Sequence, residues 1–268
     1  MKAEQTVEEP RIYAEREGET GWIVFNQPAK RNAMSLEMWE ALPGLIAEHV
    51  ADDQVRVILF RGAGGQAFVS GADISQFEKL RSDMSQAEAY NAATELAQQA
   101  IKDCAKPTVA MIHGFCFGGG VGLASSCDLR IAAGNAKFRI PAARLGLAYG
   151  FTGIKHLITL VGAAAAREIF ITAATYGAEE MLRMGWLNRV YPAEKLEEEA
   201  RAYAGRIAGN APLTLRAIKL SVAEAVKDPA ERDMAKVEAA MKRCFNSSDY
   251  QEGRRAFMEK REPRFTGD

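Results

Sequence analysis

The first half of the chain alternates short apolar runs with longer amphipathic stretches, a pattern that predicts interleaved strands and helices. Residues 12–16 and 22–26 carry β-branched and aromatic side chains on either side of a glycine-containing turn, which predicts a β-hairpin. Further short, mostly apolar runs predict buried or half-buried strands at 55–60, 107–112, 129–132 and 136–140.

Apolar residues at helical spacing fill the intervening segments and most of the C-terminal part. Ser35 is expected to cap a helix that Pro43 and the glycine after it should kink or split. A polar helix is expected over about 85–102, and a short helix that opens with three glycines over 118–126. Helices dominate beyond 153, with apolar stripes within 196–207, 215–222 and 234–245.

These elements predict an α/β core over residues 1–205 and a helical region over residues 206–268. The tail helices carry apolar faces that need partners, so association with other chains is expected. No fixed-period repeat, low-complexity segment or linker divides the chain into independent modules.

Composition places the chain among ordinary globular proteins. It has 268 residues, of which 48% are hydrophobic and 26% charged, enough apolar sequence for a sizeable core. Lys and Arg total 34 against 35 for Asp and Glu, so the basic excess typical of nucleic-acid binders is missing. We therefore expect no nucleic-acid partner.

The cysteines and the termini indicate a cytoplasmic protein. Four cysteines form neither a C-x-x-C pair nor a cluster with histidine, so no disulfide framework and no metal site are predicted. The acidic segment 1–10 has no apolar export core. The longest uncharged stretch, 107–127, holds five glycines and His113, which indicates a strand, turn and helix rather than a membrane span.

Two glycine-containing segments, 70–73 and 118–120, are the first candidates for chemistry. Each precedes or opens a predicted helix, where bare backbone N–H groups and the positive helix end could hold an anion or an oxyanion. Alternatively, the glycines serve only tight turns and close packing. Neither segment has a Walker or G-x-G-x-x-G pattern, so no nucleotide cofactor of those kinds is predicted.

Motifs follow one another in a fixed order around these segments. They are Asn26-Gln27-Pro28-Ala29-Lys30-Arg31-Asn32-Ala33-Met34, then Phe68-Val69-Ser70-Gly71-Ala72-Asp73-Ile74, then His113-Gly114 with Gly118-Gly119-Gly120. In order and spacing they resemble the enoyl-CoA hydratase/isomerase (crotonase) superfamily. Segment 249–261 is similar to the C-terminal part of that family, so the resemblance covers nearly the whole chain.

The resemblance implies an α/β fold, a crotonase-like spiral of ββα units with a C-terminal helical trimerisation region, assembled as a homotrimer or a dimer of trimers. It implies an acyl-CoA thioester as substrate, with coenzyme A as part of that substrate and no separate cofactor. In this family two backbone N–H groups hold the thioester oxygen, and the matching positions are Ala72 and Gly119. Donors placed in advance around a developing charge stabilise it. Positions matched to substrate or CoA contacts are Lys30, Arg31, Ala33, Ser70, Phe257 and Lys260, the last two with a neighbouring subunit as an alternative.

The sequence departs from the hydratase members at the positions that move protons. Those members carry one glutamate three residues after the oxyanion glycine and another after a proline in the next loop, where this chain has Gly122 and Ala142. Side chains of hydrogen or methyl cannot transfer protons, so hydration by the family mechanism is not expected. The change at Ala142 also argues against double-bond isomerisation, and Gly150 stands where the family's dehalogenases carry their aspartate nucleophile.

Tyr149 is the polar side chain that remains near the expected pocket. A tyrosine there resembles the methylmalonyl-CoA decarboxylases of the family, which however have a histidine where Ala72 stands. Loss of CO2 gives an enolate directly and needs no general base. Alternatively, Tyr149 only packs against the pocket wall. Arg144 could pair with a substrate carboxylate or lie in a structural or surface position, and His113 is expected to support the turn.

Several hypotheses therefore stay open. The chain is expected to be an acyl-CoA lyase of fatty acid metabolism that stabilises a thioester enolate, with hydratase/isomerase activity as the family default. A methylmalonyl-CoA-type decarboxylase and a non-catalytic acyl-CoA-binding subunit are the alternatives. Gln66 or a side chain of segment 75–85 could supply a replacement base for hydration.

Overall fold

The computed structural model describes residues 9–73 and 84–268. Within them a six-stranded sheet has the order β1-β2-β3-β5-β7-β10. Its strands are β1 (Ile12–Glu17), β2 (Thr20–Phe25), β3 (Val57–Gly62), β5 (Thr108–Ile112), β7 (Leu129–Ala133) and β10 (Arg189–Tyr191). The pair β1 and β2 is antiparallel, which confirms the predicted hairpin, and the following pairs are parallel.

A second sheet of four strands has the order β4-β6-β8-β9. Its strands are β4 (Ala67–Val69), β6 (Phe115–Phe117), β8 (Lys137–Arg139) and β9 (Tyr176–Gly177). Helices of the core are α1 (Leu36–Ala51), α3 (Met84–Asp103), α4 (Gly119–Ser126), α5 (Phe151–Thr172), α6 (Ala178–Arg183) and α7 (Leu196–Ala208), with short 3-10 turns η1 (Pro28–Lys30), η2 (Ala142–Leu145) and η3 (Ala193–Lys195). The chain thus has an α/β fold with two mixed sheets and C-terminal helices.

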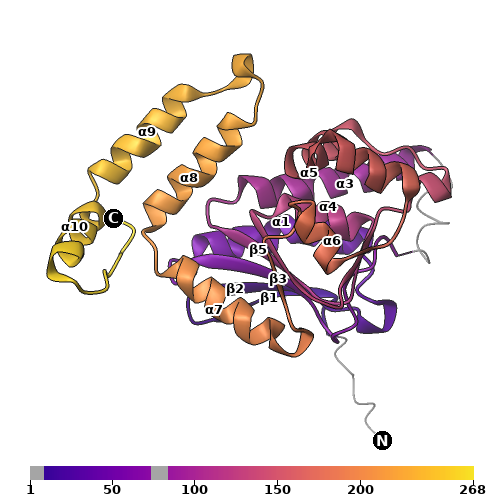
Figure 1. Cartoon of the computed structure of the whole chain (residues 1–268), viewed down its shortest axis with the longest axis horizontal. Coiled ribbons are helices and arrows are strands. Elements are labelled where there is room, and N and C mark those ends of the chain that lie inside the picture. Colours follow the sequence, from indigo (N-terminus) through magenta and orange to yellow (C-terminus); the bar gives the residue numbers. More distant parts are fainter. Residues whose placement is uncertain (1–8, 74–83) are drawn as a thin grey trace, which may run out of the picture.

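Alternation along the strands of the large sheet divides the interior into two apolar clusters. In β3, Ile58 and Phe60 join the cluster beneath α1, α3 and α4, whereas Val57 and Leu59 join the cluster beneath α7. Successive side chains of a strand point to opposite faces, so one strand contributes to both layers. Figure 1 shows α7 on one side of the sheet and the other core helices on the opposite side.

Helix α1 begins where the sequence predicts but passes its proline without splitting. The Ser35 side chain accepts a hydrogen bond from the N–H of Met38 at 3.3 Å, which caps the helix start. Pro43 lies inside the helix, which runs on to Ala51. Of the two expected outcomes, a kink or a split, the split does not occur, because the buried face of α1, with Trp39 and Leu42 fully enclosed, holds the helix despite one missing backbone bond. The predicted loop 141–153 likewise contains η2 and the start of α5.

The last helices form an arm beside the core in Figure 1, joined to it by an ion pair of 2.7 Å between Lys219 and Asp128. The arm contains α8 (Pro212–Ala225), the turn η4 (Pro229–Glu231), α9 (Met234–Phe245) and α10 (Ser248–Glu259). The preceding helix α7 packs on the large sheet as far as Ala208, so the predicted division at residue 206 falls inside α7. The division into two regions stays a prediction.

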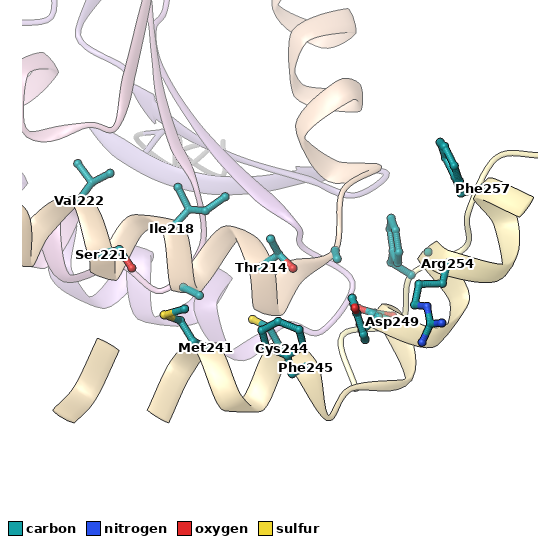
Figure 2. Close-up of a pocket in the computed structure, with 15 residues that line it drawn as sticks. Thr214, Ile218, Ser221, Val222, Met241, Cys244, Phe245, Asp249, Arg254 and Phe257 are labelled. Carbon is teal, nitrogen blue, oxygen red and sulfur yellow. The ribbon is translucent and has the colours of Figure 1, made fainter. Parts of the chain in front are cut away.

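The arm leaves apolar side chains in the open. Ile218 is 54% exposed, Phe245 62% and Phe257 82%. They contribute to a groove of about 800 Å³ between α8, α9 and α10, whose labelled side chains are drawn in Figure 2. An apolar surface of this extent is typical of a face that another protein surface covers.

Each helix in the described part of the chain is too short or too polar to span a bilayer. Two expectations fall outside the described residues. They are the replacement base from segment 75–85, of which 75–83 are not described, and the acidic segment 1–10, of which 1–8 are not described.

Candidate active site

The backbone around Ala72 is held in an extended conformation by residue Met34. The N–H of Met34 donates to the carbonyl of Gly71 at 2.8 Å, and the N–H of Asp73 donates to the carbonyl of Met34 at 3.0 Å. In extended backbone successive N–H groups point to opposite sides, so the N–H of Ala72 points away from Met34. It has no hydrogen-bond acceptor among the described residues.

The second glycine segment forms the start of α4. Gly118 is the N-cap residue, with a φ of 51° that favours glycine, and Gly119 is the first helical residue. The carbonyl of Gly118 accepts hydrogen bonds from the N–H groups of Val121 and Gly122. The N–H of Gly119 itself has no acceptor in the described structure. Gly120 packs so closely on β4 that a Cβ would collide with the carbonyl oxygen of Val69.

These two segments lie against each other. A Cβ built on Gly118 would lie 3.9 Å from the Cα of Gly71, and one built on Gly71 would lie 3.6 Å from the carbonyl oxygen of Phe117. Pro141, which precedes Ala142, is 4.0 Å from the same point on Gly118. The fold therefore brings together Ala72, Gly119 and Ala142, which are far apart along the chain.

The opposite end of α4 is closed by Arg130. This buried guanidinium donates to the carbonyl of Cys127 at 2.7 Å and to that of Trp186 at 2.6 Å. A cation at a helix C-terminus offsets the negative end of the helix dipole and satisfies its free carbonyls. The positive N-terminal end of α4 at Gly119 has no comparable partner among the described side chains, so it can act on an anion.

Gly122, one turn into α4, faces two polar side chains. A Cβ at Gly122 would lie 2.8 Å from Nε2 of Gln98 and 3.6 Å from the hydroxyl oxygen of Tyr149. Gln98 comes from α3 and Tyr149 from the segment between η2 and α5. Gln98 is not recognisable as a site residue in the sequence, because nothing in the polar pattern of α3 distinguishes it from its neighbour Gln99.

Tyr149 is held by packing around its ring. Its ring centroid lies 4.8 Å from that of Phe170, and a Cβ at Gly153 would lie 2.7 Å from its Cε1 atom. Burial raises the pKa of Tyr149, so its phenol stays protonated and can donate a hydrogen bond. The hydroxyl has no partner within the described residues.

Other predicted contact residues cluster beside Ala72. Lys30 forms an ion pair of 2.7 Å with the buried carboxylate of Asp73. The guanidinium of Arg31 lies 5.0 Å from the ring centroid of Phe115, and the backbone N–H of Ser70 donates to the carbonyl of Arg31. Ala33 is buried in the same turn. The first motif and the second are thus joined.

Further predicted residues lie elsewhere. Arg144 is exposed on η2, near Tyr149 in sequence, and has no ion pair among the described residues. Phe257 and Lys260 lie at the end of α10, in the arm formed by the last helices (Figure 1). Within one chain the structure does not bring these two residues to Ala72 and Gly119.

The surroundings of His113 and Cys116 are those of buried side chains with a structural role. Burial lowers the pKa of His113, whose Nε2 atom is buried without a partner in the described part, while the charge of Glu197 opposes this shift and that of Arg61 adds to it. Burial raises the pKa of the Cys116 thiol, which suits a core side chain. No group of three His, Cys, Asp or Glu side chains among the described residues could hold a metal ion.

Comparison with known proteins identifies the family. The family model for enoyl-CoA hydratase/isomerase matches residues 15–268. The chain is 34% identical to the crotonyl-CoA hydratase of Syntrophomonas wolfei, over 95% of this chain and 97% of the relative. It is 31% identical to the short-chain-enoyl-CoA hydratase of Clostridium acetobutylicum, over 93% and 95%. An enoyl-CoA hydratase/carnithine racemase structure from Magnetospirillum magneticum superposes with a TM-score of 0.92 at 34% identity, covering 97% of both chains.

Fold and matched sequence therefore define a crotonase-type protein, and the chain belongs to the enoyl-CoA hydratase/isomerase family. At the level that the family fixes, it is an acyl-CoA enzyme. The two relatives are hydratases by name, and the departure from the hydratase pattern at Gly122 and Ala142 stays a prediction from the sequence.

Proposed function

We propose that the N–H groups of Ala72 and Gly119 hold the carbonyl oxygen of an acyl-CoA thioester and stabilise the enolate formed from it. The observation that carries this proposal is that both N–H groups lack acceptors in the described structure, on segments that lie against each other. As the enolate forms, negative charge gathers on the thioester oxygen. Fixed donors at the start of a helix stabilise that charge without reorganisation.

The neutral surroundings of the acyl end favour a reaction that needs no general base. Hydration requires a group that activates water and a group that protonates the α-carbon. The three atoms nearest to a Cβ at Gly122 belong to an amide and a phenol, and neither is a base near neutral pH. Ala142, at the other position, has a methyl side chain.

Decarboxylation of a methylmalonyl-type thioester is the particular reaction that we favour. The bond between the α-carbon and the carboxylate carbon breaks, CO2 leaves, and the electron pair becomes the enolate whose charge rests on the thioester oxygen. A proton from solvent then adds to the α-carbon and gives the shorter acyl thioester. The Tyr149 hydroxyl, protonated and without a partner in the described chain, supports this choice because it can orient the departing carboxylate.

Coenzyme A contacts follow from the placement of the basic residues. The segments joined to Ala72 carry Lys30, Arg31 and Ser70, which are therefore suited to the phosphate and pantetheine part of the substrate. Arg144 precedes Tyr149 by a few residues in the sequence. Phe257 and Lys260 would reach such a substrate from another subunit of a homotrimer or dimer of trimers. A non-catalytic acyl-CoA-binding subunit is the alternative if no thioester is turned over.

The first test is mass spectrometry of the purified protein incubated separately with crotonyl-CoA and methylmalonyl-CoA. We expect loss of CO2 from the second and no gain of water on the first. Gain of water on crotonyl-CoA would contradict the proposed reaction and reveal another base. Binding of both thioesters without any mass change would favour the non-catalytic alternative.

A second test removes one donor. Gly119→Pro deletes the N–H at the first helical position, where proline is tolerated, and should lower turnover about a hundredfold or more. Gly119→Ala is the matched control, because it keeps the N–H and adds a Cβ at the same place, 3.3 Å from Trp39. Equal turnover of the two variants would contradict a role for this N–H group.

A further inference from the structure

Two neutral polar side chains, Gln98 and Tyr149, lie next to Gly122 and form what we call the polar pair. Gln98 and Tyr149 come from different elements, yet both approach the space that a side chain at position 122 would fill, at 2.8 Å and 3.6 Å from a Cβ placed there. Helix α3 packs against α4, and α4 packs against α5, so this approach is fixed by the core.

Both groups of the pair have unused hydrogen-bonding capacity. The Gln98 amide has no hydrogen-bond partner among residues 9–73 and 84–268, although its side chain is half-buried. The neighbouring Gln99 differs, since it is exposed and donates to Asp103 at 2.8 Å. The polar atoms of both side chains remain accessible to water, which a ligand that supplies acceptors can replace at this place.

We propose that Gln98 is a specificity-determining residue that, together with Tyr149, donates hydrogen bonds to an anionic oxygen carried on the acyl group of the substrate. This inference rests on the proposed function, because it assumes that the thioester oxygen lies at Ala72 and Gly119. It goes further by assigning a role to a residue of α3 and by naming the chemical class that it selects, an acyl-CoA with a carboxylate on its α-carbon.

Neutral donors suit this substrate better than a cation would. Decarboxylation moves negative charge from the carboxylate to the thioester oxygen, so a cation at the carboxylate would stabilise the reactant more than the transition state. An amide N–H and a phenol O–H orient the carboxylate and favour it over a plain alkyl group, and they hold its charge less strongly. A plain acyl group would instead leave both donors unpaired and desolvated, which penalises that substrate.

The experiment compares two ligands that cannot react. Calorimetry would measure binding of propionyl-CoA and of the α-sulfonate analogue of methylmalonyl-CoA, which keeps the anionic oxygens and cannot release CO2. Gln98→Met retains the size of the side chain and removes its donors. It should weaken binding of the sulfonate about tenfold and change binding of propionyl-CoA less than twofold.

Controls separate this inference from the loss of the fold and from failure of the proposed function. Gln99→Met, on the exposed side of the same helix, should change neither affinity. Gly122→Ala keeps Gln98 but crowds its amide, and should reproduce the selective loss if Gln98→Met does not fold. Equal weakening of both ligands, or no change in either, would overturn the role of Gln98 alone. If the parent protein binds neither thioester, the proposed function fails and this inference fails with it.

Discussion

At position 122 the chain has no side chain, and Gln98 and Tyr149 approach the space that one would fill. Burial keeps the phenol protonated, and an amide does not ionise, so this corner of the site donates hydrogen bonds and accepts no proton. The proposed reaction is chosen for this reason, because decarboxylation needs no proton acceptor at Gly122 or at Ala142.

His113 is a residue at which protonation should work against folding. Its Nε2 atom is buried, and burial lowers its pKa, with Glu197 opposing this shift and Arg61 adding to it. Because the unfolded chain binds the proton more readily, the free energy of unfolding should decrease as the pH falls from about 7 through the ordinary histidine pKa of about 6.5. Urea unfolding at pH 7 and pH 5 would measure the decrease.

The matched variant is His113→Leu, which removes the titrating group and its unsatisfied nitrogen. Its free energy of unfolding should depend less on pH over the same interval. His156, whose pKa burial also lowers, should account for part of the remaining dependence. An unchanged slope in the variant would show that His113 does not contribute.

Among the elements, helix α4 has hydrogen-bonded carbonyls at its C-terminal end and, within the described structure, a free N–H group at its N-terminal end. Its last carbonyls are covered by the buried Arg130, whereas the first N–H groups stay open beside Ala72. The hydrogen bonds of Arg130 hold the helix in position. An N–H group held in a fixed position can stabilise a developing negative charge without reorganisation.

Arg130→Met should therefore be strongly destabilising. It keeps the aliphatic stem but leaves the carbonyls of Cys127 and Trp186 buried without their donor, at a cost of about 3 kcal/mol. Thermal unfolding followed by circular dichroism would measure the loss, with Arg183→Met on the exposed face of α6 as the control. A melting temperature equal to that of the control would contradict this account of α4.

At the scale of the whole molecule, the arm formed by α8, α9 and α10 presents apolar side chains that the core of the same chain does not cover (Figures 1 and 2). Burial of such side chains between subunits would stabilise an assembly by about 25 cal/mol per Å² of apolar surface. The same assembly is the means by which Phe257 could approach a substrate held by another chain.

Light scattering of the full chain should return the mass of three or six subunits of 29.3 kDa. Changing Ile218 and Val222 together to Glu should shift the population toward monomer, because charges would then enter the apolar face of α8. Lys242→Glu, at an exposed polar position of α9, serves as the control. A parent protein that is monomeric at working concentration would refute the expected assembly.

Much of the fold and part of the candidate site can be inferred along the chain. Alternating apolar residues indicate β1 to β3, the Ser35 side chain indicates the start of α1, and the glycine motifs with their family resemblance indicate Ala72 and Gly119. Gly122 and Ala142 are also visible there as departures from the hydratase pattern. The inferences about strands and helix start are confirmed because each depends on neighbours a few residues away, whereas the roles of Ala72 and Gly119 stay predictions.

Contacts between distant segments could not be inferred in this way. Gln98 and Gln99 are chemically identical neighbours on a polar helix, and only the packing of α3 on α4 directs one toward Gly122 and leaves the other in solvent. The unbroken path of α1 through Pro43 depends in the same way on the core that encloses it. Residue type and spacing thus fix which groups are available, whereas packing between segments fixes which of those groups meet, because burial and orientation are properties of the folded chain.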